Sequence, residues 1–445
     1  MSPRLLQRIL LPTVLLLLFL IWGLPRLPPS HDSLTAVTST TGAAVSPSPA
    51  PVGTVSDEPL SLDQPLPSHE LAAFLHLKFN RSYVRLDEGL LTFRDATALQ
   101  RFLARARAAG VEVVGRIDAF NTARIRVTDY AAFARELAAH AGDYTAVAAN
   151  AILPPPTPPV EARSARLSVP VGDNLLATLG VRAVDPAWGR GVTIAVLDGG
   201  VLNDAAFDSR LRQLDIGYGL IGGGTDGAHA TSVAALAASA ANDASGVAPA
   251  AAILSIRVTG PDGSGDVFSV ARGIYAAVEA GAQIINVSLG GYATSTVLAD
   301  AVDYALSANV AVVAASGNDQ AAHLVWPAAY LGVVSVGATD ALGKQALFSN
   351  SGPSLQLTAP GYAIKTVGPG GTRVLFSGTS ASAPVVSGSI AALLSSNRGL
   401  NAVQAADLLA TYSTDSGPVG PDPDYGRGTV SLDRALRQSD PANKP

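Results

Sequence analysis

The stretch from Gly191 to Val201 reads GVTIAVLDGGV. Its centre, VTIAVLD, is an almost unbroken run of apolar and β-branched residues that ends on Asp198, with Gly199 and Gly200 behind it. A strand without polar alternation is typical of a parallel sheet that helices cover on both faces. Similar runs follow along the chain: AAILSIRV, AQIINVSL, VAVVAAS and GVVSVGA.

Helical segments fit between these strands. In DVFSVARGIYAAVEAG, for example, Asp266 is expected to cap the helix and Gly281 to end it. We therefore predict a doubly wound α/β domain over residues 171–437, with a mostly parallel sheet and helices on both faces. The site of such a domain lies beyond the carboxyl ends of its strands. Three polar residues are expected at that edge: Asp198, Ser288 and Asn318.

A smaller unit is predicted over residues 68–153. Its expected order is β-α-β-β-α-β, the split ferredoxin-like arrangement of an α+β fold. The first helix is expected to start at Asp95 and stop at Gly110, and the second to be capped by Thr128. The last strand, YTAVAANAIL, ends this unit.

The N-terminus predicts export. Arg4 and Arg8 precede the apolar run 9–24, so residues 1–24 are either a cleaved signal peptide or an uncleaved signal anchor. Both alternatives predict a protein that is secreted or anchored at the outer face of the cytoplasmic membrane. Three further segments are expected to lie outside the folded units: a disordered Pro/Ser/Thr-rich linker over 25–67, a Pro-rich linker over 154–170 and a tail over 438–445.

Composition narrows the classes of function. The 445 residues carry a net charge of −5 and no cysteine. The chain has no basic patch, so a nucleic-acid partner is not expected. Without cysteine, disulfides, thiolate zinc sites and a cysteine nucleophile are excluded. We expect a monomer that requires no cofactor.

Three residues suggest nucleophilic catalysis when they are taken together, although each alone has an ordinary structural explanation as a cap or a helix residue. A serine such as Ser380 needs a base to remove its proton, and His229 can supply it. A carboxylate such as Asp198 fixes the tautomer of that imidazole. Asn318, in VVAASGNDQ, and the Ser380 amide at a helix N-terminus are candidate donors to a developing oxyanion.

The order Asp, His, Asn, Ser resembles the subtilase family of serine peptidases. The segments VTIAVLDGGV, GVAPAAAILSIRV, INVSLGG, VVAASGN and FSGTSASAPVVSG are similar to family motifs, in the family's order, over nearly all of residues 175–437. The resemblance implies a serine endopeptidase that acts on polypeptides. It also implies a catalytic triad of Asp198, His229 and Ser380, with Asn318 in the oxyanion hole.

The resemblance further implies where substrate binds, by strand addition to two segments and through a roomy, mostly apolar primary pocket. The residues concerned are Gly263, Ser264, Gly265, Ser288, Leu289, Gly290, Ala314, Ala315, Ser316 and Gly317. The unit over 68–153 resembles the family's inhibitory propeptide, with its last strand in the active site and a self-cleaved junction within 150–170. A permanent accessory domain is the alternative. Structural calcium is common in relatives, but the sequence assigns no ligands.

The chain departs from the family pattern at three positions. Asp226 stands where relatives carry histidine, and a carboxylate close to His229 would favour the charged imidazole. Gly199 replaces a hydroxyl residue after Asp198. Ala381 follows the candidate nucleophile where methionine is frequent, which removes an oxidation site.

Other functions compete with this interpretation. A peptidase fold that has lost catalysis could serve as a binding or scaffold module. Gly217, Gly219 and Gly222 form G-x-G-x-x-G, but the strong strand that a dinucleotide site requires lies well upstream. An α/β-hydrolase is disfavoured because Ser380 lacks the G-x-S-x-G context.

Overall fold

The computed structural model describes Leu60, residues 67–154, Pro159, and residues 168–220 and 225–439. These residues belong to one compact unit over 51–445. The expected signal segment, most of both linkers and residues 440–445 of the tail lie outside the described residues. Within them, no helix combines the length and apolar character that crossing a bilayer requires.

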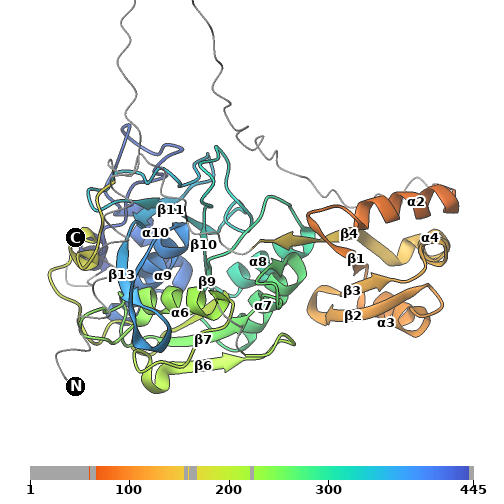
Figure 1. The fold of residues 1–445 in the computed structure, drawn as a ribbon, viewed down its shortest axis with the longest axis horizontal. Helices are drawn as coiled ribbons and strands as arrows, with labels where there is room; N and C mark the ends of the chain where they lie inside the picture. Colours follow the sequence, from red (N-terminus) through yellow and green to blue (C-terminus); the bar gives the residue numbers. More distant parts are fainter. Residues whose placement is uncertain (1–59, 61–66, 155–158, 160–167, 221–224, 440–445) are drawn as a thin grey trace, which may run out of the picture. The chain divides into compact units, whose positions relative to one another are not determined.

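A seven-stranded sheet forms the centre of the larger part, and all its neighbouring strands run parallel (Figure 1). In sheet order the strands are β12 (Leu357–Pro360), β11 (Val334–Thr339), β10 (Ala311–Ala315), β9 (Ile284–Val287), β5 (Thr193–Asp198), β7 (Ala252–Arg257) and β6 (Leu211–Leu214). The doubly wound α/β fold predicted from the apolar runs is confirmed.

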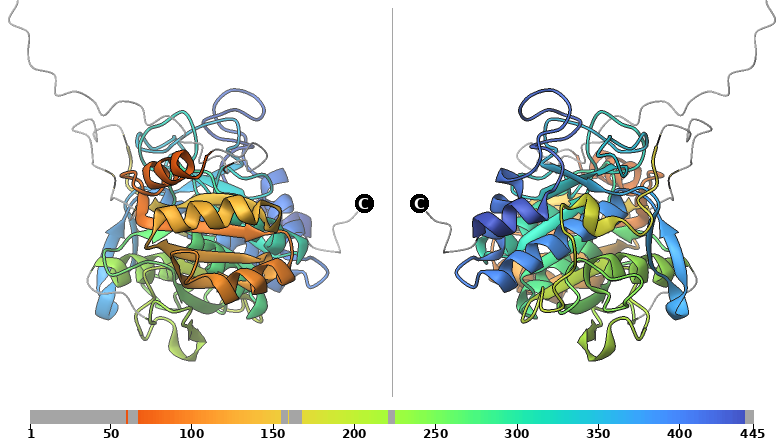
Figure 2. Two further views of the ribbon diagram at one scale, coloured as in Figure 1. Left: turned by 90° about the vertical axis from the view of Figure 1, so that its right-hand side faces the viewer. Right: turned by 90° about the vertical axis from the view of Figure 1, so that its left-hand side faces the viewer.

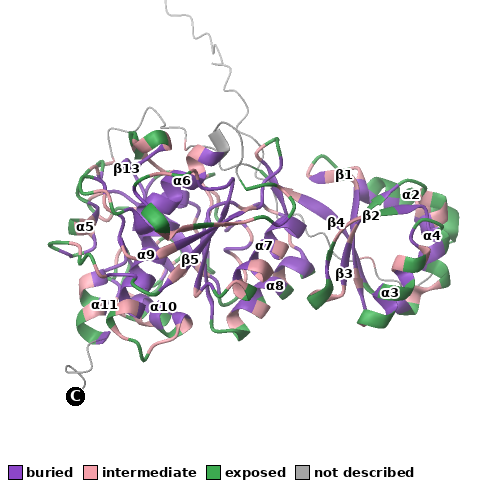
Figure 3. Cartoon of the chain, turned by 90° about the horizontal axis from the view of Figure 1, so that it is seen from below, coloured by how far each residue is buried: buried purple, intermediate pink, exposed green. Residues whose placement is uncertain are grey.

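Helices cover both faces because successive side chains of a strand point in opposite directions. Ile194 and Val196 of β5 join the core that contains α6 and α9, whereas Ala195 and Leu197 join the core that contains α7 and α8. Figure 3 shows the strands and facing helix sides buried together. The helices are α5 (Leu175–Thr178), α6 (Thr225–Ala238), α7 (Val267–Glu279), α8 (Thr296–Ser307), α9 (Thr379–Ser396), α10 (Ala402–Thr411) and α11 (Leu432–Ser439).

Several short elements were not expected from the sequence. Strands β13 (Ile364–Val367) and β14 (Arg373–Phe376) form an antiparallel pair, and β8 (Gly265–Asp266) is only two residues long. The short 3₁₀ helices are η1 (Asp118–Phe120), η2 (Ala141–Asp143), η4 (Asp208–Arg210) and η5 (Pro369–Gly371).

The N-terminal unit has the predicted β-α-β-β-α-β order, preceded by one further helix. Its elements are α2 (Ser68–Phe79), β1 (Val84–Phe93), α3 (Ala96–Arg105), β2 (Val111–Ile117), β3 (Thr122–Val127), α4 (Tyr130–Ala139) and β4 (Tyr144–Leu153). The strands pair antiparallel in the order β2-β3-β1-β4, and helices cover one face of this sheet (Figure 2).

Of the two helix caps predicted in the N-terminal unit, one is correct and one is wrong. Asp95 accepts a hydrogen bond from the Ala98 amide and caps α3 as expected. The cap of α4 is Asp129, not Thr128. The Thr128 hydroxyl instead donates to the carbonyl of Gly110 at 2.9 Å, so it ties the start of α4 to the turn that follows α3.

The sheet of the N-terminal unit continues into the larger part through β8. Ile152 pairs antiparallel with Asp266, and Leu153 pairs with Gly265. The last strand predicted for the small unit therefore ends against the first segment proposed to bind substrate.

Candidate active site

Asp198 and His229 are brought together at the carboxyl end of the parallel sheet. Asp198 ends β5 and is 2% exposed. His229 Nδ1, on α6, lies 2.9 Å from Oδ2 and 3.1 Å from Oδ1 of Asp198. The Gly199 amide also donates to this carboxylate at 2.7 Å. Nε2 of His229 is buried and has no hydrogen-bond partner among the described residues.

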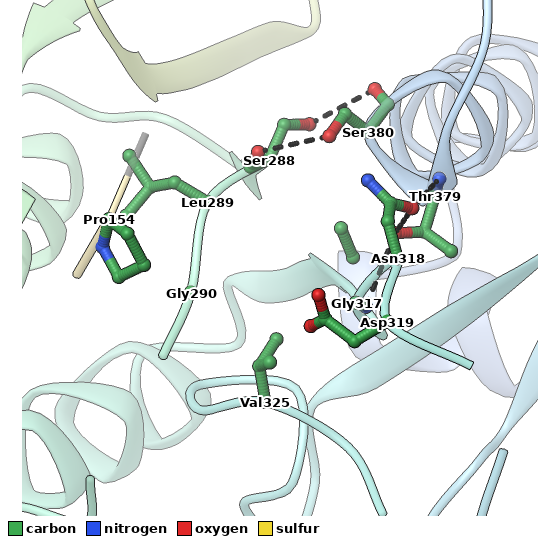
Figure 4. A pocket seen from close by; sticks show the side chains of 11 residues that line it. Pro154, Ser288, Leu289, Gly290, Gly317, Asn318, Asp319, Val325, Thr379 and Ser380 are labelled. Atoms are coloured by element: carbon green, nitrogen blue, oxygen red, sulfur yellow. Dashed lines mark hydrogen bonds between the residues drawn. The ribbon is translucent and has the colours of Figure 1, made fainter. Parts of the chain in front are cut away.

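Ser380 lies in the first turn of α9, where the helix dipole favours negative charge. Pro384 has no N–H, so the Ser380 carbonyl lacks its usual helical donor four residues on. The Ser288 hydroxyl donates to that carbonyl at 3.3 Å. The Ser380 hydroxyl donates to the Ser288 carbonyl, also at 3.3 Å, which is long for an O–H···O bond and therefore weak (Figure 4).

The side chain of Asn318 is held by Thr379, a residue that the sequence analysis did not single out. The Thr379 amide and hydroxyl both donate to Asn318 Oδ1, at 2.8 Å and 2.9 Å. The Thr379 hydroxyl in turn accepts a bond from the Gly317 amide at 3.2 Å. With its oxygen occupied twice, Asn318 keeps its N–H groups available as donors.

A cavity of about 150 Å³ opens beside Ser380 and Asn318. Ser288, Leu289, Gly290, Ala315 and Gly317, all expected to contact substrate, line it together with Pro154, Asn318, Asp319, Val325, Thr379 and Ser380 (Figure 4).

Two residues assigned to this pocket by resemblance lie elsewhere. Ala314 belongs to the apolar core on the α7 and α8 side of the sheet. Ser316 is fully buried, and its hydroxyl donates to the Asn350 carbonyl at 3.3 Å. Alternation along β10 and into Ser316, the residue after it, turns their side chains away from the pocket, whereas Ala315 faces it.

The end of β4 lies between the two segments expected to bind an extended peptide. On one side Leu153 pairs with Gly265. On the other side, a Cβ placed on Gly291 would come within 3.0 Å of Leu153 and 3.3 Å of the Ile152 carbonyl. Gly291 follows the Ser288–Gly290 segment directly, so the chain's own strand runs along the cleft.

A cluster of charges joins the N-terminal unit to the same edge. Arg85 forms an ion pair with Asp262 at 2.8 Å and donates to the Ser264 carbonyl at 2.8 Å. Arg124 lies 2.7 Å from Glu88 and 3.6 Å from Asp266.

These charges are only partly open to solvent. Asp266 and Glu88 are buried, and the neighbouring carboxylates raise the pKa of Arg124 against the effect of its own burial. The cation is therefore fixed between two buried anions.

The glycine motif is not a phosphate site. The amides of Gly217 and Gly219 both donate to Asp215 Oδ1, at 2.7 Å and 3.0 Å, so they are unavailable to an anion. Gly222 lies outside the described residues, and the side chain of Asp226 is not described either. No group of three or more His, Asp or Glu that could hold a metal occurs in the described part of the chain.

The geometry suits acyl transfer. An imidazole with one nitrogen held by a carboxylate has its other nitrogen free to accept a proton. The chain also places a hydroxyl at a helix start and an oriented amide at a pocket, beside the end of an extended strand.

Comparison with known proteins gives the same assignment. A profile of the subtilase family matches residues 189–428, more than half of the chain. Alkaline elastase YaB from Bacillus sp. (strain YaB) is 36% identical over 255 residues, which are 56% of this chain and 65% of that protein. Subtilisin Savinase from Lederbergia lenta is also 36% identical over 255 residues, covering 56% of this chain and 92% of that protein.

A solved structure extends the similarity. Fervidolysin from Fervidobacterium pennivorans, described as a keratinolytic enzyme related to subtilisin, matches with a TM-score of 0.68 and 25% identity. The match covers 80% of this chain and 62% of fervidolysin. The chain belongs to the subtilase family of serine peptidases.

Proposed function

We propose that this protein is a serine endopeptidase that cleaves polypeptides with Ser380 as nucleophile, His229 as general base and Asp198 as the carboxylate that orients His229. The observation that carries the proposal is the double contact of His229 Nδ1 with Asp198, which leaves Nε2 buried and without a described partner.

For the reaction, the Ser380 hydroxyl must break its hydrogen bond to the Ser288 carbonyl and rotate toward Nε2 of His229. The 3.3 Å bond that it leaves is weak, so this rotation costs little. His229 takes the proton as Ser380 Oγ attacks the peptide carbonyl, and Asp198 stabilises the imidazolium. The oxyanion is stabilised by the Asn318 side chain and the Ser380 amide, and the proton passes to the leaving amine as the C–N bond breaks. Water, deprotonated by His229, then attacks the resulting Ser380 ester, which releases the carboxylic acid and returns the proton to Ser380.

The same proposal makes the unit over 68–153 an inhibitory propeptide. Its support is the end of β4, which pairs with Gly265, and Pro154, which lines the pocket. A substrate strand would need these positions. We propose that the enzyme cuts its own chain within 150–170, and that the chain is exported, secreted or anchored through residues 9–24. N-terminal sequencing of the mature protein tests both the cut and the fate of the signal segment.

A fluorophosphonate probe tests the catalytic assignment, because it labels only an activated serine. We expect labelling of the wild type and none of Ser380→Ala. Ser354→Ala is the matched control, since Ser354 is exposed and its hydroxyl forms no described bond. Hydrolysis should also rise with pH as the His229 imidazole loses its proton. Equal labelling of the Ser380→Ala variant would overturn the assignment, and a flat pH profile would remove His229 as the base.

A further inference from the structure

The primary pocket contains one charge that the proposed reaction does not use. Of its described lining residues, Asp319 alone is charged, and it follows the candidate oxyanion donor Asn318 directly. In Figure 4 its carboxylate lies in the space between Gly290 and Gly317, above Val325. No Lys, Arg or His among the described residues forms an ion pair with it, so its negative charge is not neutralised by the protein.

Asp319 is exposed, but its side chain is held in place. The Tyr292 phenol donates to Asp319 Oδ2 at 2.6 Å. Burial and this hydrogen bond raise the pKa of Tyr292, so the phenol remains a donor. Short bonds of this kind to a carboxylate are among the stronger hydrogen bonds in proteins. Oδ1 accepts no bond from the described residues and is available to a ligand.

Asn350 completes the hydrogen-bond network that holds Asp319. It is fully buried and donates to the Tyr292 oxygen at 2.9 Å. Its own Oδ1 accepts bonds from the Asp319 and Ala321 amides, at 2.9 Å and 3.0 Å. The backbone and the carboxylate of Asp319 are thus both fixed through one buried amide.

The close fit of this amide also explains a glycine. Gly317 has φ of +112°, and a Cβ there would come within 2.2 Å of the Asn350 nitrogen. A larger residue at 317 would displace Asn350 and with it the support of Asp319.

Ser288, Asn318, Thr379 and Ser380 form the polar side of the pocket, and apart from them and Asp319 the lining is small or apolar. Gly290, Ala315 and Gly317 add little bulk, and Val325 is 6% exposed. A slot with apolar walls and a single carboxylate suits a side chain with a long aliphatic stem and a cationic end. Lysine and arginine have this form, whereas a glutamate side chain would be repelled.

We infer that Asp319, positioned by Tyr292 and Asn350, gives the enzyme a preference for lysine or arginine at the residue whose carbonyl is attacked. This inference rests on the proposed peptidase function and names its substrate class. Because Asp319 is exposed, solvent screens its charge, and the preference is moderate rather than absolute.

Four fluorogenic peptides that differ only at that residue test the inference: arginine, lysine, methionine and glutamate. For the wild type we expect kcat/KM for arginine and lysine to exceed that for methionine by about fivefold, as one exposed charge pair gives. The glutamate peptide should be the poorest. The arginine-to-methionine ratio should fall as salt is added, because salt screens the charge.

In Asp319→Asn, which keeps the shape of the side chain, the arginine-to-methionine ratio should fall toward one. Hydrolysis of the methionine peptide by this variant shows that it has folded. Asp303→Asn is the control for net charge, because Asp303 is exposed on α8 and lines no part of the pocket. It should leave the ratio at the wild-type value.

Tyr292→Phe tests the positioning role. It should lower the arginine-to-methionine ratio in the wild-type background but leave it unchanged in Asp319→Asn, because the phenol affects this ratio through the Asp319 carboxylate. A ratio that is the same in the wild type and in Asp319→Asn overturns the inference while leaving the peptidase function intact. Absence of both probe labelling and peptide hydrolysis would overturn the peptidase function and the inference together.

Discussion

Thr379 shows how one hydroxyl can serve two neighbours at the candidate site. It donates to Asn318 and accepts from the Gly317 amide, so it joins the candidate oxyanion donor to the pocket wall. In the sequence, the residues before Ser380 indicate only the start of a helix. The partners of Thr379 lie more than 60 positions earlier in the chain, and no local pattern reveals such a contact.

Thr379→Val should lower kcat by roughly fivefold to tenfold with little change in KM, because one of two bonds that orient the Asn318 amide is lost. Thr379→Ser keeps the hydroxyl and should restore most of kcat. Steady-state kinetics on a single peptide measure both variants. Equal kcat values for the two variants would mean that the hydroxyl has no role in orienting Asn318.

At the same scale, the residue pattern predicted some contacts and missed others. Asp198 at a strand end and His229, one of six histidines, suggested a pair only when they were taken together with Ser380, and the family resemblance assigned their roles. Asp319 can be read from the sequence GNDQ, but its inferred role in the pocket depends on the positions that Tyr292 and Asn350 impose on it. These come from separate loops, and the sequence gives no register between loops.

At the scale of elements, α6 and α9 carry His229 and Ser380 and pack closely against each other. Gly388 of α9 makes this approach possible, since a Cβ there would come within 2.9 Å of the Ala237 carbonyl in α6 and 2.8 Å of Val247. Both atoms belong to rigid, buried parts of the core. The small residues of α9 therefore fix the distance between α6 and α9.

Gly388→Ala should destabilise the fold by about 1–3 kcal/mol through overpacking. We expect a lower Tm by calorimetry, measured in a Ser380→Ala background so that self-digestion does not interfere. Gly399→Ala is the control, because its only close neighbour is the end of the flexible Asn397 side chain. An unchanged Tm for Gly388→Ala would show that the helices can separate without cost.

Elements with a strong apolar period were predictable, and the others were not. The five apolar runs correspond to β5, β7, β9, β10 and β11. Strands β12, β13 and β14 each contain a polar or charged residue, and none of them lies in a comparably long apolar run. The pair β4–β8 joins positions more than 100 residues apart, so no local pattern predicts it, and only the resemblance to an inhibitory propeptide placed this strand at the active site.

At the scale of the whole molecule, ionic contacts hold the N-terminal unit against the cleft. Arg85→Ala removes the bonds to Asp262 and to the Ser264 carbonyl. We expect the fluorophosphonate to label the uncut, full-length band roughly fivefold faster in this variant. Arg107→Ala is the control, because Arg107 is exposed and its side chain has no described partner. A rate equal to that of the control would show that Arg85 does not hold the unit in place.

The faster labelling of Arg85→Ala relative to the wild type should not depend on pH between 6 and 8. Burial opposes ionisation of Asp262, but hydrogen bonds from Arg85 and Ser264 lower the pKa of Asp262 to about 2. A lowered carboxyl pKa stabilises the contact above the ordinary value of 3.8, and the stabilisation is lost only as pH falls toward 2. The ratio of labelling rates between Arg85→Ala and wild type, which cancels the titration of His229, should be equal at pH 6 and 8.

The strand β4 that fills the cleft is joined to the larger part of the chain through residues 155–167. A tether of this length keeps an occupant at a local concentration on the order of millimolar, whatever the dilution of the protein. One cut in that tether replaces a fixed local concentration by the bulk concentration of the released piece. Under the proposed function, the cut enzyme would stay inhibited where the released piece is concentrated. Dilution into a large volume would activate it without a further reaction.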